Sequence, residues 1–542
     1  MQRKALSLIT VLVLLVIASS SLALAAQEAP DAWRAKVDPW VLDTASEGET
    51  EFIVFLTQQA NVSGAGALTS KVEKGRFVFE ALTQTADATQ GPVLKALQTA
   101  GVEYRPYWIT NMIWVRGGLS AVEAMARRSD VAHVYANPTV HVDEPVSKGD
   151  FAAPASPSAI EWNITKVNAP SVWAAGFTGQ GAVVAGQDTG YQWDHPALKG
   201  KYRGWDGTTA SHDYNWHDSI HSGGGSCGAN SVAPCDDHGH GTHTMGTMVG
   251  DDGLGNQIGM APGAKWIGCR NMDQGNGTPT TYSECYQFFI APTTVGGANP
   301  DPSKAPDVIN NSWGCPVSEG CTDPNVMLTI VNNVRAAGIV TVHSAGNSGS
   351  ACSTVSDPSA IYDSSTTVGA TTSTDAIAGY SSRGPVTVDG SNRLKPDISA
   401  PGSNIRSSVP GGGYQGGWNG TSMAGPHVAG LVALLISARP DLAGNVDTLQ
   451  TAMEQSALHL TSAQTCGGVP GSQIPNNTFG YGRIDAYAAY LAIQTPTAVT
   501  LSGMQSSANG SPILPALPLV AVPLAAAAAA VAGVWVKRRR SA

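Results

Sequence analysis

A histidine-rich stretch, DDHGHGTHTMG, occupies residues 236–246 and suggests two kinds of chemistry. His238, His240 and His243 are spaced almost like the His-x-His-x-Asp-His ligands of a binuclear zinc hydrolase, but that pattern needs an aspartate where this chain has Thr242. The chain also has no H-E-x-x-H sequence of the kind that zinc peptidases carry on a helix. Alternatively, one of these histidines is the general base of a nucleophilic catalyst, which needs only one carboxylate and one hydroxyl from elsewhere in the chain.

Three polar residues next to apolar runs are candidates for the rest of such a catalyst. Asp188 follows GAVVAGQ and Asn347 follows IVTVHSAG, so each is expected at the carboxyl end of a strand, where open sheets place their sites. Ser422 is expected at the start of a buried helix, whose free N–H groups favour developing negative charge. Taken singly, each is equally well explained as a turn or cap residue. Together they predict that His240 takes the proton of Ser422 while Asp188 orients the imidazole and Asn347 donates to the oxyanion.

Two further residues of the same helix are given structural roles. Pro426 is predicted in the first helical turn, where proline is tolerated. His427 is predicted to be a packed residue with a structural role and not a catalyst.

The sequence blocks around these residues resemble the subtilisin-like serine proteases in content and in order. They lie between about residues 160 and 495 and read VVAGQDTG, HGHGTHTMGT, VINNSWG, SAGNSG, YSSRGP, KPDISAPG, GTSMAGPHVAG and GYGRIDA. The resemblance implies the same roles for Asp188, His240, Ser422 and Asn347. It also implies that Ser312, Trp313 and Gly314 lie along an extended peptide substrate by strand addition. The cysteine-bearing segment at 266–293 most resembles the bacillopeptidase F-like branch.

Metal binding and specificity are less well defined by the resemblance. The family's tight calcium loop has an Asn-rich bulge before a G-V-A-P segment, whereas this chain has DDGLGNQIGMAPG there. No cofactor is expected for the chemistry, the metal site is unassigned, and Asp251 and Asp252 are the candidate ligands if structural calcium binds. Asp357 is expected in an exposed loop, with a position near the first specificity pocket as the alternative.

The elements that must position these residues form two folded units. Between residues 161 and 495, short apolar runs alternate with helical stretches, which predicts an α/β domain with a doubly wound, mostly parallel sheet. Residues 48–142 alternate strand (51–56), helix (74–101), strand (112–117), helix (119–130) and strand (131–142). This pattern predicts a small α+β ferredoxin-like domain, which resembles the inhibitory and chaperone propeptide of the family. Pro, Ala and Ser at 143–160 predict a linker and processing region.

The two ends of the chain suggest export and anchoring. Arg3 and Lys4, an apolar stretch and the small-residue exit Ala23-Leu24-Ala25 predict a signal peptide over residues 1–25. A linker at 496–512 precedes an apolar stretch at 513–536, long enough to span a membrane, and a basic cytoplasmic tail at 537–542. The sequence leaves open whether this transmembrane or sorting anchor is retained or cleaved.

Composition narrows the class of protein further. A formal net charge of −10 with no basic block in the body argues against a nucleic-acid partner. In an exported chain, eight cysteines that all follow residue 220 predict disulfides. Short loops favour the first three of the following pairs and leave the fourth: Cys227–Cys235, Cys269–Cys285, Cys315–Cys321 and Cys352–Cys466.

These observations predict a secreted or surface-anchored serine endopeptidase that is made as a zymogen and works through an acyl-enzyme. Its expected partners are extended peptide substrates, its own propeptide, and a membrane through the C-terminal segment. The alternative is a catalytically inactive binding or adhesion protein on a protease fold. The presence of all three triad residues and of Asn347 argues against that alternative.

Overall fold

The computed structural model describes residues 31–142 and 159–494. Several predicted segments lie wholly or largely outside the described residues. These are the signal peptide, the linker and processing region, and the C-terminal linker, anchor and basic tail.

The larger unit is built on a seven-stranded sheet in which every pairing is parallel. The strands are β7 (Val183–Asp188), β8 (Trp216–Asp218), β10 (Lys265–Arg270), β13 (Val308–Asn311), β14 (Val340–Ser344), β15 (Thr366–Thr371) and β16 (Ile398–Pro401). Their order is β16-β15-β14-β13-β7-β10-β8, so the chain winds one way from β7 and then returns to wind the other way. The predicted doubly wound α/β fold is confirmed, and its switch point lies between β7 and β13.

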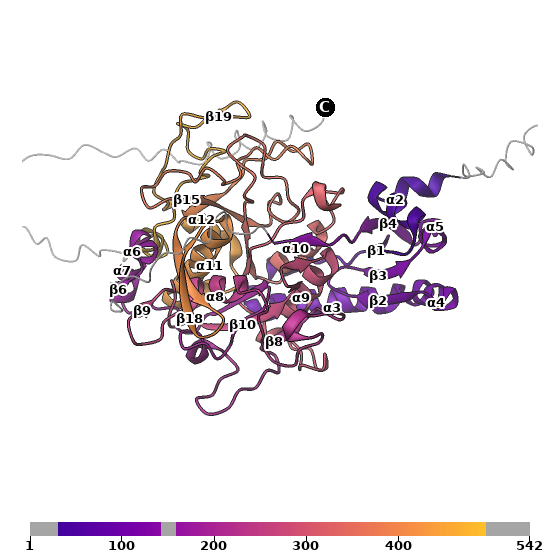
Figure 1. Cartoon of the computed structure of the whole chain (residues 1–542), viewed down its shortest axis with the longest axis horizontal. Coiled ribbons are helices and arrows are strands. Elements are labelled where there is room, and N and C mark those ends of the chain that lie inside the picture. Colours follow the sequence, from indigo (N-terminus) through magenta and orange to yellow (C-terminus); the bar gives the residue numbers. More distant parts are fainter. Residues whose placement is uncertain (1–30, 143–158, 495–542) are drawn as a thin grey trace, which may run out of the picture. The chain divides into compact units, whose positions relative to one another are not determined.

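Helices cover both faces of this sheet because successive strand residues point to opposite sides. Val184 and Val308 belong to one core with α8 (His240–Val249), α11 (Thr421–Ala438), α12 (Val446–Gln455) and α13 (Ala486–Ala492). Ala185 and Ile309 belong to the other core with α9 (Pro279–Ile290) and α10 (Leu328–Ala336). Figure 1 shows α8 and α11 side by side within this unit.

Helix α11 is a core helix. Among the described residues it is the one helix long and apolar enough to cross a membrane, but 94% of it is buried within the protein. Its burial follows from its composition, which is apolar around the whole circumference and rich in Ala and Gly.

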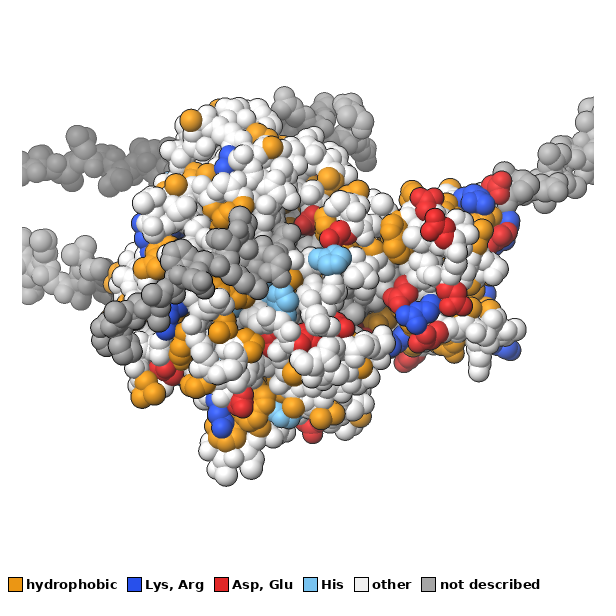
Figure 2. All heavy atoms as spheres, viewed as in Figure 1, with side chains coloured by type: hydrophobic (Ala, Val, Ile, Leu, Met, Phe, Trp, Pro, Cys, Tyr) orange, Lys and Arg blue, Asp and Glu red, His pale blue; other side chains and the backbone are white. Residues whose placement is uncertain are grey.

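The smaller unit has the predicted ferredoxin-like arrangement. Its antiparallel sheet runs β2-β3-β1-β4, with β1 (Thr50–Leu56), β2 (Glu103–Tyr107), β3 (Met112–Gly117) and β4 (Val131–Ala136). The helices are α3 (Lys71–Thr89), α4 (Gly91–Ala100) and α5 (Leu119–Ala126). Figure 2 shows acidic and basic side chains mixed over this unit and fewer charged side chains on the adjoining larger unit.

Three details of the smaller unit differ from the prediction. The helix predicted at 74–101 is two helices, because α3 ends at Thr89 and Pro92 lies in the first turn of α4. Strand β2 was not predicted, because it has no alternating pattern of burial and only Tyr107 is buried. Trp33 and Val41, the latter from α2 (Pro39–Glu47), share the core of the sheet, so the packed unit begins before residue 48.

The last strand of the smaller unit leaves its sheet. The predicted strand at 131–142 is divided into β4 and β5 (Val140–His141), and β5 pairs antiparallel with β12 (Asn276–Gly277) of the larger unit. Strand β12 in turn pairs with β11 (Met272–Asp273). The remaining elements are α6 (Trp162–Lys166), α7 (Ala169–Ala174), β6 (Ala159–Ile160), β9 (Asn256–Gln257), β17 (Ile405–Val409), β18 (Gly413–Trp418), β19 (Thr465–Cys466) and β20 (Val469–Pro470).

All cysteines of the larger unit are paired. The four predicted disulfides are confirmed, and no cysteine is free. One of them, Cys352–Cys466, joins segments far apart in the chain, and this is the kind of cross-link that most constrains an unfolded chain.

Candidate active site

Asp188 and His240 form a buried pair at the carboxyl edge of the large sheet. Asp188 is the last residue of β7 and His240 is the first residue of α8. The imidazole Nδ1 lies 2.7 Å from Asp188 Oδ1, and the same oxygen accepts a hydrogen bond from the backbone N–H of Thr189 at 2.7 Å. Because a carboxylate only accepts, Nδ1 is the donor, and the ring is held in one tautomer and one orientation.

The start of α8 is fixed by Asp236, which serves as an N-terminal cap. Its Oδ1 accepts from the backbone of Gly239 at 2.7 Å and from Thr189 Oγ1 at 2.9 Å, and its Oδ2 accepts from the backbone of Thr242 at 2.9 Å. A Cβ atom on Gly241 would lie 2.1 Å from the Gly190 carbonyl oxygen. Only glycine therefore lets α8 approach the end of β7 closely enough for His240 to meet its partner.

The other histidines of this region have structural surroundings. His243 stacks on Trp418 with ring centroids 4.3 Å apart, and burial lowers its pKa to about 3, so it remains neutral. Within residues 31–142 and 159–494, no cluster of metal-ligating side chains includes His238, His240 or His243, so the geometry does not support a binuclear zinc site there. His427 is packed as predicted, with Nδ1 against the Met423 carbonyl oxygen at 2.9 Å, and burial lowers its pKa to about 4.

Ser422 lies at the same edge of the sheet as Asp188. Asn311 of β13 pairs with Gln187 of β7, so Ser312 and Asp188 follow at equivalent positions on neighbouring strands. Ser422 Oγ donates to the Ser312 carbonyl oxygen at 3.5 Å, and Ser312 Oγ donates to the Ser422 carbonyl oxygen at 3.1 Å. Ser312 thus fixes the first turn of α11 to the end of β13.

Pro426 lies deeper in α11 than predicted, and the hydrogen bond from Ser312 Oγ to the Ser422 carbonyl oxygen explains why it is tolerated there. Pro426 is the sixth residue of α11 and not part of its first turn. Because proline has no N–H, it cannot make the helical hydrogen bond to the Ser422 carbonyl group. The Ser312 hydroxyl replaces the missing donor, so the proline is tolerated through a side-chain contact.

Asn347 lies beside the N-terminus of α11. Its Oδ1 accepts from the backbone N–H of Thr421 at 2.8 Å and from Thr421 Oγ1 at 3.0 Å, which directs the Nδ2 group to the other side. A Cβ atom placed on Gly420 would lie 3.6 Å from both Asn347 Nδ2 and the backbone nitrogen of Ser422. The side-chain amide of Asn347 and the backbone N–H of Ser422 therefore lie near one another at the start of α11.

The segment after β13 packs closely against Asp357. Trp313 is buried and stacks on Tyr282 at 3.9 Å. A Cβ atom on Gly314 would lie 2.5 Å from Asp357 Oδ2, and one on Gly346 would lie 3.8 Å from the same oxygen. Asp357 is half-buried beside these glycines, so it does not lie in the exposed loop that the sequence favoured.

Strand β12 is a feature that the sequence did not reveal. The backbone N–H of Val142 donates to the Gly275 carbonyl oxygen at 2.7 Å. A Cβ atom on Gly275 would lie 3.0 Å from Val142 Cγ1 and 3.3 Å from His238 Cδ2. The end of the smaller unit therefore reaches the residues that precede His240. The glycines of DQGNG were the available signal, because they mark a backbone that another strand can approach.

Asp251 and Asp252 do not fit a calcium site. Both oxygens of Asp252 accept hydrogen bonds from the chain, from Leu254 N and Asn256 N on one side and from Tyr414 Oη on the other. Burial would raise the pKa of Asp252, but these hydrogen bonds outweigh it and lower the pKa to about 2. Asp251 likewise accepts from the backbone of Gly253. These carboxylates stabilise their own loop.

Comparison with known proteins adds the following findings. The subtilase family matches residues 179–482, a region that contains the whole candidate site. Bacillopeptidase F of Bacillus subtilis (strain 168) is 37% identical over 454 residues, which cover 80% of this chain and 30% of that protein. Subtilisin E of the same organism is 29% identical over 72% of this chain and 87% of its own length. Subtilisin of Bacillus pumilus is 33% identical over 52% of this chain and 86% of its own length.

Proposed function

The chain belongs to the subtilase family, and from this we propose that it is a serine endopeptidase whose triad is Asp188, His240 and Ser422. The observation that carries the proposal is the oriented Asp188–His240 pair at the sheet edge where Ser422 contacts Ser312. An inactive binding protein would have no need for a buried, single-tautomer imidazole at this edge.

In the proposed reaction, Ser422 Oγ attacks the carbonyl carbon of a peptide bond and His240 Nε2 takes its proton. Asp188 stabilises the imidazolium that forms. The Ser422 backbone N–H and Asn347 Nδ2 donate to the oxyanion. The imidazolium then protonates the leaving amine, and water hydrolyses the acyl-enzyme with His240 again as the base.

We propose that the substrate binds as an extended strand between two backbone edges. Residues Ser312–Gly314 form one edge, as the sequence predicted, and Asn276–Gly277 of β12 form the other. Strand β5 already pairs with β12, which supports the idea that this edge accepts an added strand.

The smaller unit is proposed to be the inhibitory propeptide. Its strand β5 uses the same edge of β12 that a substrate would need. Polar contacts join the two units elsewhere. Lys71 Nζ lies 2.5 Å from Asp307, and Asn333 Nδ2 donates to the Ile109 carbonyl oxygen at 2.7 Å. Processing between residues 142 and 160 would then release an active enzyme.

We further propose an extracytoplasmic location. The predicted signal peptide at 1–25 and the predicted anchor at 513–536 support export and surface attachment. Both segments lie outside the described residues, and mass spectrometry of the mature chain ends would identify whether each is removed.

Fluorophosphonate labelling tests the central proposal. The processed wild type is expected to be labelled, and Ser422→Ala, processed in trans by wild-type enzyme, is expected to be unlabelled and to lose on the order of 10⁶-fold in kcat. Ser437→Ala is the matched control, because Ser437 is a buried serine of the same helix. Asn347→Ala should retain labelling while kcat falls about 10²–10³-fold. A folded, processed wild type that is neither labelled nor active would overturn the proposal.

A further inference from the structure

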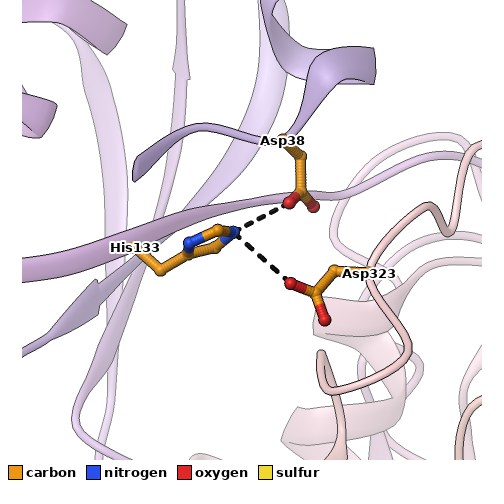
Figure 3. A group of neighbouring side chains, drawn as sticks. All are labelled: Asp38, His133 and Asp323. Atoms are coloured by element: carbon orange, nitrogen blue, oxygen red, sulfur yellow. Dashed lines mark hydrogen bonds and ion pairs between the residues drawn. The ribbon is translucent and has the colours of Figure 1, made fainter. Parts of the chain in front are cut away.

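We propose that Asp38, His133 and Asp323 bind a divalent cation of the zinc class that joins the smaller unit to the larger one. His133 Nε2 lies 2.8 Å from Asp38 Oδ1 and 3.7 Å from Asp323 Oδ2. One ligand atom from each residue lies within 4.8 Å of the other two. Figure 3 shows both carboxylates converging on the same ring nitrogen.

The three ligands come from both units. Asp38 precedes α2 and His133 lies in β4, so both belong to the smaller unit, whereas Asp323 follows the Cys315–Cys321 disulfide of the larger unit. A cation held here would cross-link two units that no disulfide joins, because all four disulfides lie within the larger unit.

Each carboxylate is oriented by contacts on its outer oxygen. Asp38 Oδ2 accepts from the backbone N–H of Ala136 at 2.9 Å. Asp323 Oδ1 accepts from the backbone N–H of Asn325 at 2.7 Å and from its Nδ2 at 3.0 Å. The inner oxygens, Asp38 Oδ1 and Asp323 Oδ2, are thereby aimed at His133. Such outer contacts are what holds metal-ligating carboxylates in position.

The charge of the cluster also favours a cation. Two carboxylates face one imidazole, and Asp38 is almost fully buried, with 5% of its side chain exposed. Within the described residues no lysine or arginine forms an ion pair with Asp38 or Asp323. A divalent ion would balance both acids, which a single imidazolium cannot.

The donor set selects the kind of cation. One imidazole nitrogen with two carboxylate oxygens suits Zn²⁺, whose bonds to such ligands are about 2.0–2.2 Å. Tetrahedral bonds of that length separate ligand atoms by about 3.4 Å, which lies between the 2.8 Å and 3.7 Å that now separate His133 Nε2 from the two carboxylate oxygens. Ca²⁺ needs six to eight oxygens, and this cluster does not supply them. His133 and Asp323 are each about a quarter exposed, so water can complete the coordination shell.

Calorimetric titration of Zn²⁺ into the full-length Ser422→Ala chain tests the site. The chain is produced without a polyhistidine tag and is freed of metal with EDTA. We expect one Zn²⁺ per chain with a micromolar or tighter Kd, at least tenfold weaker binding in His133→Gln and Asp323→Asn, and a melting temperature raised by several degrees in excess Zn²⁺. Ca²⁺ should not reproduce either effect.

His141→Gln is the matched control. His141 also faces an acid of the larger unit, Glu319 at 3.0 Å, but only that one, so its loss should leave Zn²⁺ affinity unchanged. Equal Zn²⁺ affinity in His133→Gln and the parent chain would place the metal elsewhere and overturn the proposal. Absence of binding by a folded parent chain would also overturn it and would leave the cluster as a hydrogen-bonded ion pair. Because the parent chain already lacks the nucleophile, neither result depends on peptidase activity.

Discussion

Two aspartate–histidine pairs of nearly equal length occupy very different surroundings in this molecule. His240 Nδ1 lies 2.7 Å from Asp188 Oδ1, and His133 Nε2 lies 2.8 Å from Asp38 Oδ1. The first pair is closed off, with 0% of the histidine and 1% of the aspartate side chain exposed, and lies within one unit. In the second pair, 24% of the histidine side chain is exposed, and Asp323 of the larger unit lies 3.7 Å from the same ring nitrogen, Nε2.

The comparison shows that contact distance does not determine what a pair does. At Asp188 the acid holds Nδ1, which is the nitrogen that a general base does not use, so the ring is oriented for proton transfer through Nε2. At Asp38 the acid and its neighbour Asp323 both face Nε2, an arrangement suited to a shared cation. The nitrogen that is engaged and the number of acids around it separate the two roles.

The largest effect expected from this comparison comes from removing the acid of each pair in turn. Asp188→Asn should lower kcat by about 10⁴-fold, because the amide no longer holds His240 in the required tautomer. Asp38→Asn should leave the kcat of the processed enzyme unchanged, since residue 38 belongs to the unit that we propose processing removes. Active-site titration followed by steady-state kinetics on each processed protein measures both effects. Similar losses of kcat in the two variants would show that the pairs are not functionally distinct.

A smaller effect is expected at Glu284, which contacts two histidines of the larger unit and two residues of the smaller unit. Glu284 of α9 accepts from His217 Nε2 and His221 Nε2, each at 2.9 Å, and from Tyr107 Oη of the smaller unit at 2.9 Å. Arg105 lies 3.5 Å from the same carboxylate. Burial would raise the pKa of Glu284, but the hydrogen bonds from the two histidines outweigh it and hold the pKa below its usual range. Burial would lower the pKa of His221, but the hydrogen bond to Glu284 raises it overall.

The sign of the pH dependence follows from the raised pKa of His221. Its contribution to stability is full below the ordinary histidine pKa of about 6.5 and is lost as the pH rises through the higher folded value. His221→Gln should therefore destabilise the Ser422→Ala chain by about 1.5–3 kcal/mol near pH 6 and by less at pH 9. Thermal melts at both pH values measure this, with His459→Gln as the exposed control. If His221→Gln lost the same stability at both pH values, His221 would act by packing alone.

The sequence predicted the region around Asp188 better than the region around Asp38 for a physical reason. Residues that end parallel strands meet at one edge whatever the loops between them do, so Asp188 and Asn347 could be grouped from apolar runs alone, whereas Ser312 was assigned from the family resemblance. Glycine spacing marked the start of α8, and short loops marked three of the disulfides. The fourth, Cys352–Cys466, followed by elimination.

What the sequence could not reveal depends on how two separately folded units dock. Asp323 follows a disulfide loop with no periodic pattern, and nothing in it indicates proximity to His133. Strand β5 was merged with β4 because both are apolar and alternating, whereas only the position of β12 divides them. The role of Ser312 toward Pro426 was also hidden, since it requires the register of β13 beside α11.

The smallest expected effect is on stability, and it concerns the hydrogen bond by which Ser312 supports α11. In the Ser422→Ala chain the carbonyl group of residue 422 remains, and Ser312→Ala removes its hydrogen-bond donor, at a cost of about 1–3 kcal/mol for a buried unsatisfied acceptor. Pro426→Ala restores an N–H at the position that normally serves this carbonyl group. In the Pro426→Ala background, Ser312→Ala should therefore cost about 1 kcal/mol less.

The contact from Asn310 Nδ2 to Ser312 Oγ is lost in both backgrounds and cancels from the difference. Denaturant unfolding of the four chains measures the coupling. Strictly additive penalties would mean that Ser312 holds α11 by packing and that the proline is accommodated in another way.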